Sequence, residues 1–105
     1  MKTGVLLTVA ALCFTGAGQV RAQDSAAGEA LYQDVCRNCH GPSGQGLASF
    51  PRLTGLGAEQ IVSRLGQYRA GERVGPNSAL MRPIAADLSD EDMANLAAYI
   101  TTAFE

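Results

Sequence analysis

The sequence is poor in metal-binding and aromatic residues. It contains one histidine, His40, one lysine, Lys2, and no tryptophan, and only 6% of its residues are aromatic. A structural zinc site takes four ligands, and the sequence has no second cluster of cysteine and histidine that would complete one. Internal repeats and low-complexity tracts are also absent from it. The length of 105 residues allows one small domain.

Long apolar runs are lacking as well. A membrane-spanning helix needs about 20 apolar residues, and the apolar run 5–14 falls well short of that. The run follows Lys2 and precedes a small-residue site that ends at Ala22, which is the layout of a secretory signal peptide. We therefore expect residues 1–22 to be a cleaved signal and the mature protein to have no membrane anchor. A lipoprotein signal is disfavoured because Leu12, which is not small, precedes Cys13.

Cleavage changes the charge and the cysteine content. Basic residues fall from eight to six while the ten acidic residues remain, so that residues 23–105 carry a net charge of −4 and no lysine. An acidic exported chain without a basic patch argues against nucleic acid and anionic membranes as partners. The remaining cysteines are Cys36 and Cys39. We expect a periplasmic domain at 23–105, of a size that usually needs a cofactor or another staple to be stable.

Hydrophobic periodicity predicts an all-α domain with long loops. Helices are expected at residues 25–39, at 58–70 and from Ser89 to the end, with loops at 41–57 and 71–88. Within the first helix, the apolar residues Ala27, Leu31 and Val35 recur at helical spacing. Ser89 is followed three residues later by an acid, as in a capping box. No segment alternates between apolar and polar residues as a strand does.

The stretch CRNCH, residues 36–40, fits three kinds of site: a thiol–disulfide pair, part of a zinc site, or a covalent haem anchor. A thiol–disulfide motif normally follows a strand, and none is predicted here. Thiols at i and i+3 lie on one face of a helical turn. They can add to the two vinyl groups of one porphyrin. This attachment would place the next residue, His40, beside the iron. The haem anchor therefore explains more than the two alternatives do.

A second iron ligand from this chain has to be a methionine. Because the mature chain has one histidine and no lysine, His/His and His/Lys pairs are excluded. Met93 falls on the apolar stripe of the last helix, where methionine usually fills the core. Met81 falls in the expected loop 71–88, which Pro83 would stiffen. We expect His40 and Met81 to bind the iron; the alternative for Met81 is an exposed or space-filling side chain.

At this point the sequence resembles the class I cytochromes c, both the short bacterial single-haem members and one half of the tandem two-haem members. GEALY and NLAAYI are similar to the segments at which the family's first and last helices cross, and Gly28 would allow close approach there unless it is a tolerated weak spot. The resemblance implies one haem c attached through Cys36 and Cys39. It also implies a compact fold of about three main helices with loops wrapped around the haem. The lack of tryptophan places the chain with the compact bacterial members rather than the mitochondrial type.

The resemblance also implies roles for residues outside CRNCH. In the family, a proline carbonyl accepts the Nδ1–H of the proximal histidine, and PRLTG offers Pro51 for this role unless it is a plain turn proline. QYRAGER is similar to the end of a family helix that contacts the haem propionates. The candidates for those contacts are Tyr68, Arg69 and Arg73, each of which is as often an ordinary surface or core residue. Asn77 lies where it could hydrogen-bond the Met81 sulfur.

These features imply a periplasmic electron-transfer protein that is not an enzyme and that cycles its iron between Fe(III) and Fe(II). Its partners would be transient redox proteins with small interfaces. A second hypothesis is a haem relay subunit of a larger exported oxidoreductase, for example a sulfur- or alcohol-oxidising enzyme. A third, a gas-binding haem protein with an open site, is disfavoured because the segment around Met81 offers no distal histidine or acid–base pair.

Overall fold

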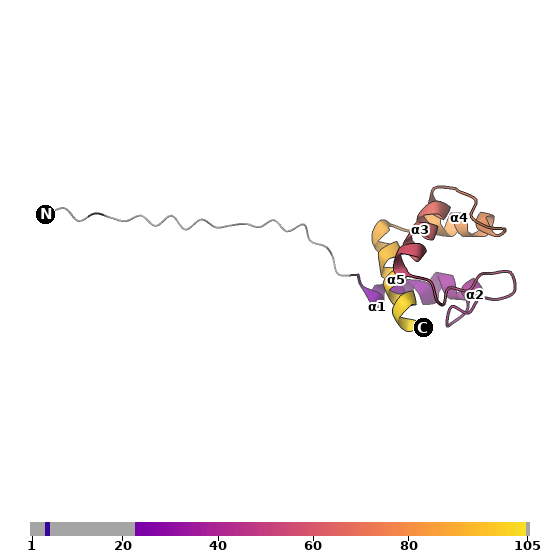
Figure 1. The fold of residues 1–105 in the computed structure, drawn as a ribbon, viewed down its shortest axis with the longest axis horizontal. Coiled ribbons are helices and arrows are strands. Elements are labelled where there is room, and N and C mark those ends of the chain that lie inside the picture. Colours follow the sequence, from indigo (N-terminus) through magenta and orange to yellow (C-terminus); the bar gives the residue numbers. More distant parts are fainter. Residues whose placement is uncertain (1–3, 5–22, 105) are drawn as a thin grey trace.

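The computed structural model describes Gly4 and residues 23–104. The predicted signal peptide, residues 1–22, lies outside this part of the chain except for Gly4. The elements in order are α1 (Ser25–Leu31), a π-helical segment η1 (Tyr32–Cys36), α2 (Arg37–His40), α3 (Ala58–Arg69), α4 (Ser78–Ala86) and α5 (Asp90–Ala103) (Figure 1). The predicted all-α class is confirmed, since the described residues form no strand beyond one isolated bridge. None of the helices in that part of the chain is long and apolar enough to cross a membrane.

The first helix runs without a break from α1 through η1 to α2. It begins where the Asp24 carboxylate accepts a hydrogen bond from the Ala27 amide at 3.0 Å, and it ends at Gly41, whose φ of 88° suits glycine. The predicted apolar stripe was wrong at Ala27, which is exposed. The buried positions are Gly28, Tyr32 and His40, and the wider π-helical turn changes the phase of the residues that follow Tyr32.

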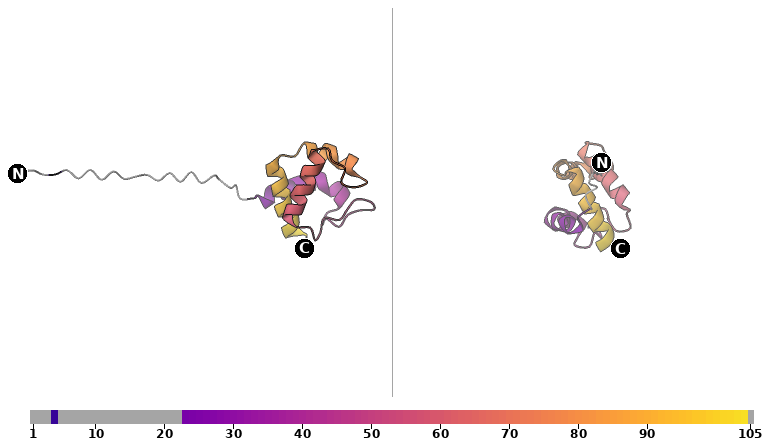
Figure 2. Two further views of the ribbon diagram at one scale, coloured as in Figure 1. Left: turned by 45° about the horizontal axis from the view of Figure 1, so that its top comes forward. Right: turned by 90° about the vertical axis from the view of Figure 1, so that its left-hand side faces the viewer.

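The helices α1 and α5 cross at very short range (Figure 2). A Cβ built on Gly28 would lie 2.0 Å from the Asn95 carbonyl oxygen and 3.0 Å from the Tyr99 Cβ. The Asn95 side chain also accepts a hydrogen bond from the Asp24 amide at 2.8 Å. The prediction that Gly28 serves close approach is confirmed, because any larger residue would push the two helices apart.

The core lies along α5. Tyr32, Met93 and Leu96 are the largest fully buried side chains, and Met93 fills the core as predicted. Tyr32 packs edge-on against Phe104 at a centroid distance of 5.0 Å, and both rings contact Tyr99. Such pairs add about 0.5–1.5 kcal/mol each to the burial of their area. This cluster fixes the angle between the first helix and α5.

The predicted capping of α5 is also confirmed. The Ser89 hydroxyl accepts from the Asp92 amide at 3.0 Å, and the Asp92 carboxylate accepts from the Ser89 amide at 3.0 Å. This is a capping box, which satisfies two backbone donors that a helix start leaves without partners.

The segment 71–88 is not a continuous loop. Residues Ser78–Ala86 form α4, a fourth helix that carries Met81 in its second turn and contains Pro83. The sequence suggested a loop because Gly75, Pro76 and Pro83 all disfavour helix, but only Pro83 falls inside it. Proline removes one hydrogen bond, and the loss is tolerated here because α4 packs along α3.

Candidate functional site

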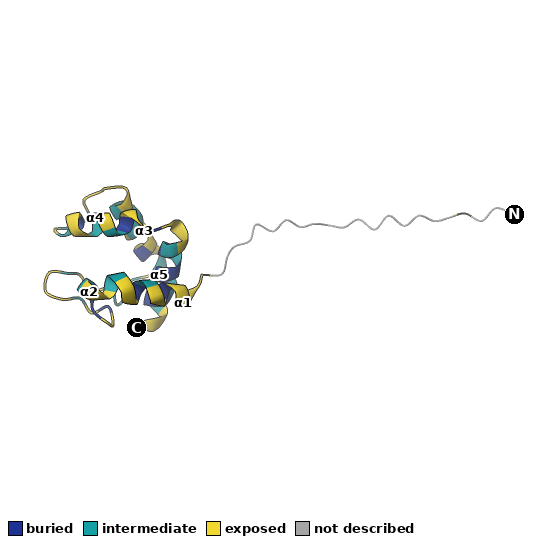
Figure 3. Cartoon of the chain, turned by 180° about the vertical axis from the view of Figure 1, so that it is seen from behind, coloured by how far each residue is buried: buried dark blue, intermediate teal, exposed yellow. Residues whose placement is uncertain are grey.

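A cavity of about 390 Å³ lies between the first helix and the pair α3 and α4. Figure 3 shows α2 and α4 on the same side of the fold, with exposed and half-buried residues on each. This volume is within the range of about 300–1,000 Å³ that is usual for ligand pockets. Its lining is mainly apolar and comes from every helical part of the fold except α1. It includes Val35, Leu53, Leu56, Ile61, Leu65, Ile84, Leu96 and Ile100. Leu65 and Tyr68 of α3 are only half-buried because they face this space.

Both cysteines of CRNCH line the cavity. Cys36 ends η1, Cys39 lies in α2, and both are half-buried. Burial raises the pKa of the Cys36 thiol to about 11, so it is protonated at neutral pH. Cysteines of thiol–disulfide enzymes have a lowered pKa instead. Within the described residues, no group of three or more Cys, His, Asp or Glu side chains is placed to hold a metal. The site therefore favours neither the thiol nor the zinc interpretation.

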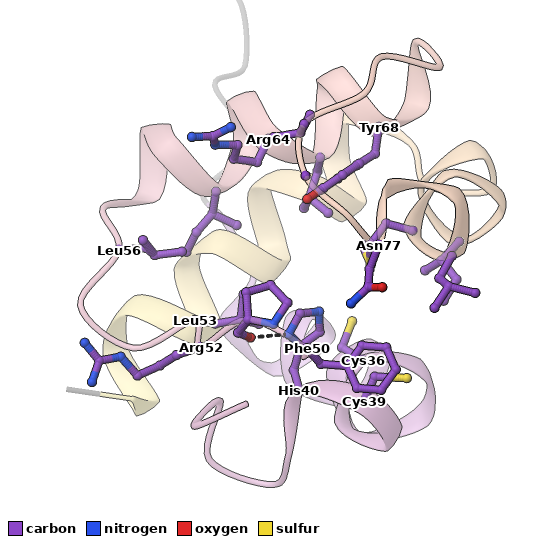
Figure 4. Close-up of a pocket in the computed structure, with 18 of the residues that line it drawn as sticks. Cys36, Cys39, His40, Phe50, Arg52, Leu53, Leu56, Arg64, Tyr68 and Asn77 are labelled. Atoms are coloured by element: carbon purple, nitrogen blue, oxygen red, sulfur yellow. Dashed lines mark hydrogen bonds between the residues drawn. The ribbon is translucent and has the colours of Figure 1, made fainter. Parts of the chain in front are cut away.

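His40 is buried at the wall of the cavity, and one ring nitrogen is already engaged. Its Nδ1 lies 2.7 Å from the Pro51 carbonyl oxygen, the contact that was anticipated from PRLTG (Figure 4). A carbonyl can only accept, so Nδ1 carries a proton, and Nε2 is the ring nitrogen left to bind a metal. The His40 carbonyl in turn accepts from the Gly46 amide at 2.8 Å. The ring is thus fixed in the tautomer that can bind a metal through Nε2.

The two methionines of the described chain have different surroundings. Met81 lines the cavity from α4 and is half-buried, whereas Met93 is 1% exposed in the core on α5. A thioether is thus available at the cavity together with an imidazole nitrogen.

The charged residues of the lining are not the arginines anticipated from QYRAGER. Arg69 points elsewhere: its guanidinium donates to the Leu88 carbonyl at 3.2 Å and to the Asp90 carboxylate at 2.6 Å. Arg73 is exposed and does not line the cavity, while Tyr68 does. Arg52 and Arg64 take the place of the two arginines in the lining.

The positive charge is confined to one side of the site. Figure 4 shows the guanidinium groups of Arg52 and Arg64 on the opposite side of the pocket from the two cysteine sulfurs. No aspartate or glutamate occurs among the described residues that line it. The cavity therefore has a mainly apolar lining, with two thiols at one side and two positive charges at the other.

Asn77 also lines the cavity, but its side chain does not contact Met81 by a hydrogen bond. Its amide nitrogen donates to the carbonyl and to the hydroxyl of Ser49, both at 3.1 Å. The contact joins the segment before α4 to the loop that holds Pro51. This differs from the suggested bond to the methionine sulfur.

The comparisons with known proteins agree with this geometry. The family model described as cytochrome c matches residues 25–104. The chain belongs to the cytochrome c family. It is 45% identical over 89 residues to cytochrome c-554(547) of Halothiobacillus neapolitanus and 50% identical over 82 residues to cytochrome c-554(548) of Halomonas halodenitrificans. Each alignment covers 77% of this chain and 98% of the relative.

Solved structures extend the comparison to larger cytochromes. Cytochrome c4 of Acidithiobacillus ferrooxidans superimposes with a TM-score of 0.69 at 29% identity, over 81% of this chain and 52% of the other. A thiosulfate dehydrogenase of Marichromatium purpuratum superimposes with a TM-score of 0.67 at 34% identity, over 78% of this chain and 20% of that chain. The chain thus spans about half of the cytochrome c4 and a fifth of the dehydrogenase chain. The predicted compact cytochrome fold is confirmed.

Membership in the cytochrome c family implies a covalently bound haem c, and the residues of the cavity fit this group. Haem is a flat apolar ring that carries reactive vinyl groups and, at another edge, two propionate carboxylates. The thiols of Cys36 and Cys39 lie on one side of an apolar space and the guanidinium groups of Arg52 and Arg64 on the other. The prediction of a haem c cofactor and of an electron-transfer haem protein is confirmed at the level of the family.

The helical spacing in the sequence could have identified Arg64 of α3 as a cavity residue, although Arg64 was not among the predicted residues. Arg64 follows Ile61 by three residues and precedes Tyr68 by four, so it shares the cavity-facing stripe of the helix. Arg69 is one position beyond that stripe and turns toward α5. Arg52 directly follows Pro51, and only the fold of the loop shows that it reaches the cavity.

Proposed function

We propose that this cytochrome is a periplasmic electron carrier whose haem c is attached through Cys36 and Cys39 and whose iron is held by His40 and Met81. The observation that carries the proposal is the convergence of two thiols, a buried imidazole with its Nδ1 engaged, and a thioether on one apolar cavity. Residues 1–22 are proposed to be the export signal. The chain is proposed to relay electrons and to catalyse no reaction of its own.

The haem, when bound, supplies an iron that changes between Fe(III) and Fe(II) by one electron. The polypeptide keeps the positions of the two iron ligands constant while the charge of the iron changes. The Pro51 carbonyl holds the His40 ring in one orientation and increases its electron donation. Since His40 and Met81 are set on helices, neither ligand needs to move when the charge changes. A thioether ligand raises the potential relative to a second imidazole.

The lining also shifts the balance between the oxidation states. The apolar side chains exclude water, which disfavours the state of higher charge. Arg52 and Arg64 offset the carboxylates of the propionates, because a planar guanidinium suits a carboxylate. The thioether, the apolar lining and the two arginines favour the reduced state, against the electron donation that Pro51 increases, and they support a carrier of raised potential.

A second candidate function is a relay subunit of a larger exported oxidoreductase. It is favoured by the superposition on part of a thiosulfate dehydrogenase chain. Purification from the native source at low salt separates the two. A free carrier elutes as a small haem protein, whereas a relay subunit elutes with a larger partner.

Expression together with a c-type maturation system tests the proposal. We expect haem that stays with the polypeptide under denaturing conditions, a reversible one-electron wave by voltammetry, and loss of stable double attachment in Cys36→Ala and Cys39→Ala. An Asn38→Ala variant, changed between the two cysteines, is the matched control and should retain its haem. A matured chain without covalent haem, or one whose wave is irreversible, would contradict the proposal.

A further inference from the structure

Asn77 occupies the position that starts α4, yet its side chain does not serve that helix. It is the N-cap residue, and its side chain makes no capping hydrogen bond. Asparagine is one of the preferred capping residues because its side-chain oxygen can accept from the first turn. Here the amide donates instead to Ser49, in a solvent-exposed contact with the loop 41–57. The local turn is held by Ser78, whose hydroxyl accepts from the Val74 and Gly75 amides at 2.8 and 2.9 Å.

The Asn77–Ser49 contact joins two walls of the cavity. Within residues 23–104, no other hydrogen bond joins the loop 41–57 to the segment 71–86. Among the close helix pairs, α4 packs against α3 only. Figure 4 shows Asn77 extending from its segment toward the side where Phe50 and Cys36 lie.

Each residue of this contact is linked to a proposed iron ligand, Asn77 to Met81 and Ser49 to His40 through Pro51. Asn77 and Met81 are four residues apart, both line the cavity, and the Met81 amide donates to the Asn77 carbonyl at 3.3 Å. Ser49 lies in the tight turn closed by the hydrogen bond from the Phe50 amide to the Leu47 carbonyl at 2.8 Å. Pro51, which holds His40, follows that turn at once.

We infer that Asn77 is a positioning residue: its contact with Ser49 clasps the Met81 helix to the loop that orients His40, and so keeps the thioether over the cavity. This inference rests on the proposed ligation by Met81. The clasp acts by limiting how often α4 swings away, and therefore how often another ligand can take the place of the sulfur. A site that is open for a larger fraction of the time binds an added ligand more tightly in proportion to that fraction.

The experiment uses imidazole as a competitor for the oxidised, haem-loaded protein and Asn77→Asp as the variant. Aspartate keeps the size and the capping ability of asparagine, but it has no N–H to donate to the Ser49 carbonyl and sets a negative charge against that oxygen. The Ser49 hydroxyl can also donate to a carboxylate, so that half of the contact is removed by Ser49→Ala instead. We expect imidazole to bind Asn77→Asp about two- to tenfold more tightly than the unchanged protein, which is the range that one solvent-exposed hydrogen bond can contribute. Ser49→Ala, which removes one of the two acceptors, should shift the affinity in the same direction by a smaller factor. Ser43→Ala, in the same loop but away from the clasp, is the matched control and should change nothing.

A Met81→Ala background separates the clasp from the ligation on which it depends. If the clasp acts through Met81, imidazole binds Met81→Ala tightly and adding Asn77→Asp has no further effect. If Met81→Ala leaves the imidazole affinity unchanged, the proposed ligation and the clasp both fail. If Met81→Ala raises the affinity while Asn77→Asp and Ser49→Ala do not, the ligation stands and the clasp is wrong.

Discussion

The crossing of α1 and α5 offers a quantitative test, because the same substitution can be made at a crowded and at an open helical glycine. In Gly28→Ala, the new methyl group would meet the Asn95 carbonyl oxygen at 2.0 Å and its carbon at 2.6 Å. These are backbone atoms, so relief requires the helices to separate by about 1 Å or more. In Gly66→Ala, nothing lies within 4 Å of the added methyl group.

The expected free energies have opposite signs. Alanine in place of glycine stabilises a helix by about 1 kcal/mol, which is the whole effect expected at Gly66. At Gly28 the overpacking costs about 3 kcal/mol or more when backbone has to move, so the net destabilisation is about 2 kcal/mol. For a domain of this size, about 4–8 °C of melting temperature corresponds to each kcal/mol, so the midpoint falls by about 8–16 °C.

Urea unfolding of the haem-loaded protein, followed by far-ultraviolet circular dichroism, measures both variants on one scale. We expect the midpoint of Gly66→Ala to lie above that of the unchanged protein and the midpoint of Gly28→Ala to lie below it, with similar slopes. If Gly28→Ala proves as stable as Gly66→Ala, the close approach of the two helices is not what requires glycine, and the packing argument fails.

Three further predictions concern single side chains. Tyr32→Phe leaves the buried Gly41 carbonyl without its 2.6 Å donor and should cost about 1–3 kcal/mol in urea unfolding. Burial raises the pKa of Tyr32 from 10.0 to about 12, so the folded state holds the phenolic proton more tightly than the unfolded state does. The free energy that this contributes to folding is fully present below pH 10 and is lost as the pH rises to about 12, so the stability of the unchanged protein should fall over that window more than the stability of Tyr32→Phe. An equal fall in stability for both proteins would contradict the assignment. Ser89→Ala removes the α5 cap and should lower the free energy of unfolding by about 1 kcal/mol, whereas no change would mean that the capping box contributes nothing. Arg64→Gln should lower the reduction potential by tens of millivolts in voltammetry, more than Arg69→Gln, whose charge is paired with an acid; the reverse order would show that Arg69 lies nearer the haem.

Helix boundaries and the helix crossing were predictable because their causes are local or are encoded in single residue types. The cap at Ser89 needs an acid three residues on, and the sequence shows it. Gly28 could be singled out because glycine inside a helix is costly without a reason. The histidine–proline contact followed from the resemblance and from the position of PRLTG after CRNCH.

The parts that were missed depend on tertiary packing. The helix α4 contains a proline, and its stability comes from its packing along α3, which local signals do not report. The stripe of the first helix was placed on Ala27, whereas Gly28 is the residue that meets α5, and the pattern of residue types does not show on which side of the stripe the other helix crosses. The direction of a long arginine side chain is also set by its neighbours: Arg69 turns to Asp90 although it stands close in sequence to Tyr68.

The most direct test of the central claim is the visible spectrum of the haem-loaded protein, oxidised, reduced, and reduced under carbon monoxide, with Met81 and Met93 changed one at a time to leucine. We expect a low-spin spectrum with the far-red sulfur–iron band and no response to carbon monoxide. That band should disappear in Met81→Leu, where the thioether lines the cavity, and persist in Met93→Leu, where it is buried in the core. A high-spin spectrum that responds to carbon monoxide in the unchanged protein, or a band that survives Met81→Leu, would contradict ligation by His40 and Met81.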